Sequence, residues 1–142
     1  MVGASKGCPS RYAPRLPGIE RGVAVRRYTL RLDGFVSARA NRQGGDLLTW
    51  PLVFHGHQLE LNCSTSAAGS IRVEVQDEAG EPVAGFALAD CPEIFGDTLA
   101  RVVTWKRGAD LSRLAGKPVR LRFEFKDTDF YAFRFAKAPT SP

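Results

Sequence analysis

The sequence lacks long apolar runs. None approaches the roughly 20 residues that a helix needs to cross a bilayer, and residues 1–22 hold no continuous apolar core like that of a signal peptide. We therefore expect neither a membrane segment nor an export signal in this chain. Hydrophobic residues make up 44% and charged residues 25% of the 142 positions, which indicates a folded domain and excludes a disordered chain.

Cysteine is scarce, and its spacing fits no metal-binding motif. Cys8, Cys63 and Cys91 form no CxxC pair and lie too far apart for a zinc knuckle. Cys63 is in phase with Leu59 and Leu61, which favours a buried free thiol. A disulfide between Cys63 and Cys91 is the alternative, and it requires an oxidising compartment.

Excess positive charge is missing from most of the chain, although the net charge is +5. Residues 1–31 hold seven basic residues and one acidic residue, a net of +6, so the remainder carries −1. The sequence contains no zinc-finger spacing, helix-turn-helix pattern or RNA-binding aromatic signature beside these basic residues. We therefore expect a solvated leader rather than a surface for nucleic acid.

Catalytic and nucleotide-binding motifs are also absent. The sequence has no GxSxG elbow and no HExxH helix, and GASKG at residues 3–7 does not match a phosphate-binding loop. His55 and His57 alternate across a turn without a partner motif. We expect no enzymatic activity from this chain.

What the sequence does contain is a two-residue alternation of apolar and polar side chains. This alternation predicts half-buried strands over residues 25–32, 58–63, 70–77, 118–127 and 129–135. Clusters of Gly, Pro, Asp, Asn and Ser separate them, as is typical of turns between antiparallel strands. The segment QDEAGEP at residues 76–82 predicts a short hairpin connection.

Helix signals are confined to one place. Asp110 can cap a first turn, and Gly116 can adopt the left-handed conformation that ends it before Pro118. The predicted fold class is therefore all-β, an antiparallel β-sandwich or jelly roll with one short helical turn. We expect three parts: a basic leader or linker over residues 1–22, the β-sandwich module over 23–137 and a tail over 138–142.

Asp127 and Asp129 share one phase at the turn before the last predicted strand. Two carboxylates so placed can bind calcium together with carbonyl oxygens, and they can also serve acid and base chemistry. Aspartates that simply form the turn give the same pattern. The pair is a weak calcium candidate, and we expect no other cofactor.

Three phrases occur in order along the chain: YTLRLDGFVSARA, the run from GGDLLTW to EIFGD, and the run from VVTWKRG to YAFRF. Together they resemble a β-sandwich module at the C-terminal end of large bacterial proteins, many described as glycoside-hydrolase family 32-like or five-bladed-propeller proteins. The resemblance covers residues 26–135. It implies a non-catalytic accessory domain, either a C-terminal piece of a longer protein or a relative without a propeller, with an extracellular or periplasmic location.

The resemblance leaves two functions open. In the first, the module binds a poly- or oligosaccharide, with Trp50 as stacking platform and Arg42, Asp46 and His55 as polar neighbours. In the second, it is a structural or interaction module that packs against an upstream catalytic domain or forms a homo-oligomer through its edge strands. Trp50 is in phase with apolar neighbours and Trp105 with Val103, so the exposure of the two tryptophans discriminates between the functions.

Overall fold

The computed structural model describes residues 25–137. The predicted leader, Cys8 and the predicted tail lie outside these residues. The chain divides into two units, residues 1–35 and 36–142, which we describe separately. In the first unit, residues 25–35 contain one isolated bridge, at Thr29, and a turn closed by a 2.9 Å hydrogen bond from Gly34 N to Arg31 O. The prediction of a strand over residues 25–32 is therefore wrong. Alternating apolar and polar residues form a strand only where they pair along their length with another strand.

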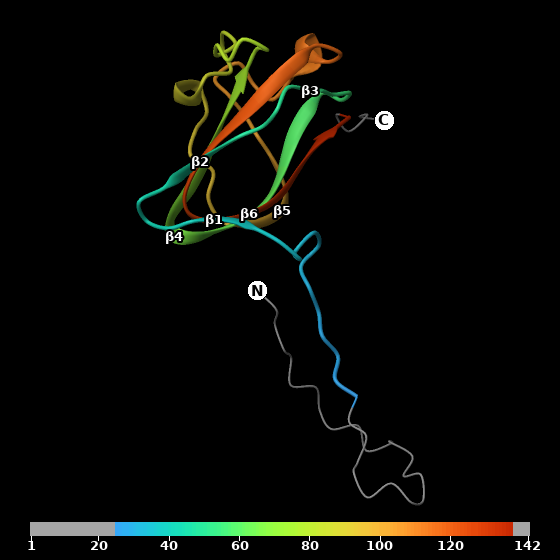
Figure 1. Cartoon of the computed structure of the whole chain (residues 1–142), viewed down its shortest axis with the longest axis vertical. Helices are drawn as coiled ribbons and strands as arrows, with labels where there is room; N and C mark the ends of the chain where they lie inside the picture. The colour runs from blue at the N-terminus through green and yellow to red at the C-terminus, as the bar shows by residue number, and fades with distance from the viewer. Residues whose placement is uncertain (1–24, 138–142) are drawn as a thin grey trace, which may run out of the picture. The chain divides into compact units, whose positions relative to one another are not determined.

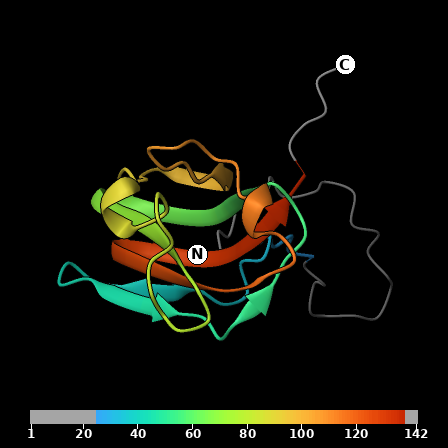
Figure 2. The same cartoon turned by 90° about the horizontal axis from the view of Figure 1, so that it is seen from above.

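Within residues 36–137, the second unit forms one antiparallel sheet of six strands (Figure 1). These are β1 (Ala38–Ala40), β2 (Gly45–Leu48), β3 (Leu52–Val53), β4 (Gln58–Gln76), β5 (Asp97–Val102) and β6 (Pro118–Ala136). The order is β1, β6, β4, β5, and β2 and β3 also pair with β6. Seen from above, β6 lies between β4 and β2, and β4 lies between β6 and β5 (Figure 2). The all-β antiparallel class is confirmed.

Two strands of 19 residues, β4 and β6, form the centre of this sheet. Their pairing shifts at two places, and the larger shift lies between Thr65, opposite Thr128, and Ser70, opposite Lys126, so residues 66–69 of β4 face Asp127 alone. An insertion of this kind is a β-bulge, which bends the strand that carries it. Asp127 adopts a left-handed conformation, with φ of 43°.

The hydrophobic core lies on one side of β4 and β6, both before and after the bulge. Alternate residues on either side of the bulge are fully buried, as the two-residue period predicts. Loop side chains complete the same cluster, among them Phe86, Ile94, Trp105 and Leu111. The main strand members are Leu59, Leu61, Cys63, Ile71, Val73, Val75, Val119, Leu121, Phe123 and Phe125. The prediction that Cys63 is a buried thiol is confirmed; Cys91 is also a buried thiol, so the two form no disulfide.

The opposite side of the sheet carries charged pairs that join neighbouring strands. Arg72 contacts Glu124 at 2.6 Å, and Arg134 contacts Glu60 at 2.7 Å. Such partly exposed pairs contribute little stability, about 0 to 1 kcal/mol each. They do show which side of the strands faces water.

One edge of β4 is closed partly by side chains. Val75 exchanges backbone hydrogen bonds with the segment after the hairpin, and Ile71 does so with Ile94. Between these points the N–H of Val73 donates to Cys91 Sγ at 3.4 Å, and its carbonyl accepts from Trp105 Nε1 at 2.9 Å. Burial raises the pKa of the Cys91 thiol, which keeps the thiol neutral near pH 7.

The short local elements agree with the sequence. The turn at residues 77–80 brings Gln76 opposite Pro82, which confirms the hairpin. The predicted helical turn is a 3-10 turn, Ser112–Leu114, where Asp110 accepts from the N–H of Ser112. A second 3-10 turn spans Leu88–Asp90. Over residues 25–137, neither is long enough to cross a bilayer.

Candidate functional site

The two tryptophans differ completely in exposure. Trp105 is buried, whereas Trp50 has 87% of its surface exposed. An indole ring is costly to leave in water, so a fully exposed tryptophan is more informative than an exposed leucine. Trp50 is therefore the starting point for the candidate site.

The backbone that carries Trp50 is firmly held. Thr49, the preceding residue, binds both polar groups of one residue on β6: its N–H donates to Leu121 O and its hydroxyl accepts from Leu121 N, each at 3.0 Å. Pro51, the following residue, restricts the conformation of Trp50 further. A ring presented on a fixed backbone loses little conformational entropy when a ligand binds it.

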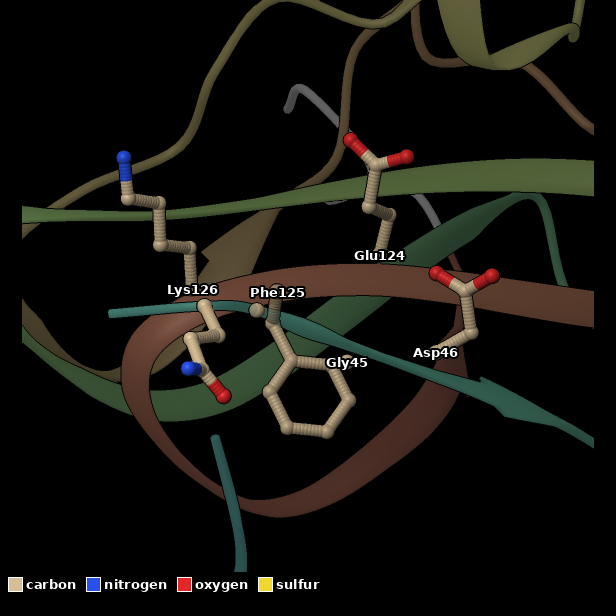
Figure 3. A pocket seen from close by; sticks show the side chains of 7 residues that line it. Gly45, Asp46, Glu124, Phe125 and Lys126 are labelled. Atoms are coloured by element: carbon tan, nitrogen blue, oxygen red, sulfur yellow. The ribbon is translucent and has the colours of Figure 1, made fainter. Parts of the chain in front are cut away.

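A shallow hollow of about 440 Å³ lies along β6, beside the start of β2. In Figure 3, the side chains of Glu124 and Lys126 extend to one side of β6, and Phe125 extends to the other. Asp46 borders the hollow from β2, where it pairs with Glu124 across the sheet. The remaining lining residues are Gln43, Gly44 and Gly45.

The charges around the hollow are fixed by ion pairs. Arg122 donates to Asp46 Oδ2 at 2.7 Å, and this hydrogen bond raises the pKa of Arg122. Glu124 Oε1 accepts from Arg72. Within the described part of the chain, no donor engages the second oxygen of Asp46 or of Glu124, so both can accept hydrogen bonds from a ligand.

We call the surface formed by Trp50, the exposed Leu48 and this hollow the outer β2 surface. Asp46, Leu48 and Trp50 are all exposed and follow one another at every second residue. Leu48 lies opposite Arg122 on β6, the same residue that binds Asp46. The outer β2 surface thus combines an aromatic ring, an aliphatic side chain and hydrogen-bonding groups.

The structure does not gather the four predicted sugar-binding residues into one place. Asp46 lies at the hollow and Trp50 four residues further, about 13 Å along an extended chain. Arg42 is exposed in the turn before β2, and His55 is exposed beyond β3. Only Asp46 and Trp50 belong to the outer β2 surface.

The calcium candidates are engaged by protein groups. Asp127 accepts a hydrogen bond from the Ser66 hydroxyl, and Asp129 accepts one from Ser37 Oγ at 3.1 Å and lies 3.9 Å from Arg39. In residues 25–137, no group of three or more His, Cys, Asp or Glu side chains is placed to hold a metal ion. Asp127 thus binds a protein group at the bulge, and Asp129 binds protein groups at β1 and just before it.

Sequence reasoning missed Arg122, Glu124 and Lys126 as members of the surface. Their alternation with buried residues in β6 does place them on the water-facing side. No sequence pattern near Asp46, however, indicates that it is their neighbour, because β2 and β6 lie far apart in the sequence and meet only in the folded sheet.

Comparison with protein-family models, with curated proteins and with solved structures finds no match to this chain.

Proposed function

We propose that this chain is a non-catalytic binding module that holds a poly- or oligosaccharide on the outer β2 surface, with Trp50 as the platform under a sugar ring. The exposure of Trp50 on a fixed backbone is the observation that carries the proposal. A sugar ring presents C–H groups on its face and hydroxyls around its rim. The indole ring suits the face, and the open oxygens of Asp46 and Glu124 suit the hydroxyls.

The wider setting of the module belongs to the same proposal. We place it as an accessory domain of a bacterial glycoside hydrolase of the family 32-like type, acting outside the cytoplasm, with catalysis in another domain. The β-sandwich or jelly roll predicted from the sequence is also part of the proposal. It is supported by the bulge in β4, since residues before it and after it enter one core.

Replacing Trp50 with alanine is expected to weaken glycan binding strongly. Loss of a central aromatic anchor weakens binding by about 2 kcal/mol or more, roughly thirtyfold in Kd. The measurement is a glycan-array screen of the whole chain, followed by affinity electrophoresis or calorimetry on the best ligand. Because Trp50 is exposed, the variant should keep its thermal midpoint.

Three further variants separate stacking from general surface effects. Trp50→Phe keeps an aromatic face and should retain part of the affinity, whereas Trp50→Leu keeps only apolar bulk and should not. Val53→Ala truncates another exposed apolar side chain, 56% exposed, and should bind like the wild type. Glycan binding that is unchanged in Trp50→Ala would remove Trp50 as the platform, and a screen without any bound glycan would overturn the carbohydrate function.

An interaction module is the second candidate function. It is favoured by exposed apolar residues far along the chain from Trp50, among them Tyr28, Phe35 and Phe95. A glycan platform at Trp50 gives no reason for these residues to be exposed.

A further inference from the structure

On the side away from the hydrophobic core, β4 and β6 place polar side chains opposite one another. The opposite pairs are Arg72 with Glu124, Glu74 with Arg122, and Gln76 with Arg120. The first two pairs each join an acid to a base. In the third, Gln76 is neutral, and its amide donates to Glu74 at 2.8 Å. Arg120 therefore lacks the carboxylate that the other two arginines have.

No other group of the described chain takes the place of that carboxylate. Among the buried side-chain nitrogen and oxygen atoms of residues 25–137, Arg120 Nε is the one without a hydrogen-bond partner. No acidic residue in the same range pairs with this guanidinium. A buried N–H without an acceptor is costly, and folded proteins keep few of them. Because no ion pair holds Arg120, its side chain can turn toward a ligand without breaking one.

Arg120 lies beside the exposed Trp50. Thr49 is bound to Leu121 by two hydrogen bonds, so the residue after Thr49 comes level with the residue before Leu121. These two residues are Trp50 and Arg120. The Arg120 side chain shares the side of β6 that carries Arg122, since Leu121 between them is buried. Neighbouring strands lie about 4.8 Å apart, so a ligand over Trp50 reaches Arg120 as well.

We propose that the glycan held at the outer β2 surface is acidic, and that Arg120 binds the carboxylate of a uronic acid whose ring lies on Trp50. This inference rests on the proposed function and names the class of its ligand. A guanidinium matches a carboxylate with two parallel N–H···O bonds. In a uronic acid the carboxylate is attached directly to the ring, so a ring stacked at one strand places it over the next.

The acidic residues of the surface do not oppose such a ligand. Asp46 and Glu124 are each paired with an arginine. Lys126 extends to the same side of β6 as Glu124 (Figure 3) and pairs with no carboxylate of residues 25–137. The surface therefore keeps uncompensated positive charge at Arg120 and Lys126, which attracts an anionic polymer.

The test measures binding of three polyuronates, each beside its methyl ester, to the full chain by affinity electrophoresis and calorimetry. The probes are polygalacturonate, polyglucuronate and alginate. Esterification keeps the sugar ring and removes the charge, so the wild type should bind the best acid form about tenfold or more tightly than its ester. High salt should reduce this preference.

Three variants assign the preference to one side chain. Arg120→Gln should bind the acid and the ester alike, and Arg120→Lys, which keeps the charge, should retain part of the preference. Arg101→Gln removes an exposed charge from β5 and should behave like the wild type. The comparison of acid with ester on the wild type needs no variant, so it decides even where Arg120→Gln lowers the thermal midpoint.

Failure of this inference is distinguishable from failure of the carbohydrate function. A neutral glycan bound through Trp50, with no polyuronate bound, overturns the inference and leaves the function standing. Polyuronate binding that is unchanged in a folded Arg120→Gln, or equal for acid and ester, does the same. A chain that binds neither neutral nor acidic glycans overturns the carbohydrate function and the inference with it.

Discussion

Gly69→Ala is expected to destabilise the fold by about 3 kcal/mol or more. A Cβ at this position would overlap the carbonyl oxygen of Asp127 and lie 2.9 Å from that of Lys126. Both oxygens belong to the backbone, so no rotation of a side chain can relieve the overlap. The bulge of β4 must move away from β6, which disturbs the pairing on either side of it.

Gly80→Ala is the matched control for this substitution. Gly80 has a φ of +92°, but nothing lies within 4 Å of its added Cβ. Its replacement should therefore cost only the conformational strain of a left-handed residue, about 1–2 kcal/mol. Urea denaturation followed by circular dichroism compares the two. If Gly69→Ala is no worse than Gly80→Ala, the close approach at the bulge is not what requires glycine.

Trp105→Ala is expected to cost about 3–5 kcal/mol, the usual range for removing a large aromatic residue from a core. The indole is 3% exposed and meets the ring of Phe86 edge to face, with centroids 5.3 Å apart. Its loss leaves a cavity beside the edge of β4. The same substitution also leaves the carbonyl of Val73 without its donor.

Trp105→Phe separates these two losses. It keeps most of the ring and removes the N–H that binds Val73 O, so its cost should be about 1–3 kcal/mol, the penalty of a buried unpaired acceptor. Trp50→Ala is the control and should stay within about 0.5 kcal/mol of the wild type, as exposed positions usually do. A Trp105→Phe protein as stable as the wild type would show that packing alone accounts for Trp105.

The sequence predicts the strand composition well but misjudges how the strands connect. Residues 58–63 and 70–77 were expected to be separate strands, joined by a turn at STSAAGS. In the structure residues 58–76 form one strand, β4, because both halves pair with β6 in the same direction, and Asp77 lies just after it. Gly, Ser and Ala in a row are compatible with a turn and with a bulge, and only the partner strand decides between them.

The last strand shows the same limit. Strict alternation in DFYAFRF puts Tyr131, Phe133 and Phe135 on the core side, yet Phe130 is the buried residue there and Tyr131 only half-buried. The register of β6 against β4 shifts at this point, since Asn62 pairs with Ala132 and Cys63 with Phe130. A bulge adds one residue, which moves each following side chain to the other face.

The candidate site was predictable only in part. The sequence indicates Trp50 and Asp46 as possible binding residues, but the exposure of Trp50 depends on how Thr49 attaches to β6. The grouping of Arg42 and His55 with Trp50 rested on closeness in sequence. An extended chain carries neighbours apart at about 3.3 Å per residue, so closeness in sequence is a poor guide in a β-rich fold.

The central place of β6 also dictates when this sheet can form. Among the described strands, β1, β2 and β3 pair with no strand except β6, and β4 shares most of its length with it. Because β6 follows all of them in the chain, a ribosome must synthesise it before the earlier strands find their partners. Nearly every pairing is then between distant residues, such as Ala38 with Phe130. Such a topology folds slowly, on the millisecond to second scale, and until β6 arrives the apolar halves of β4 stay open to chaperones and to aggregation.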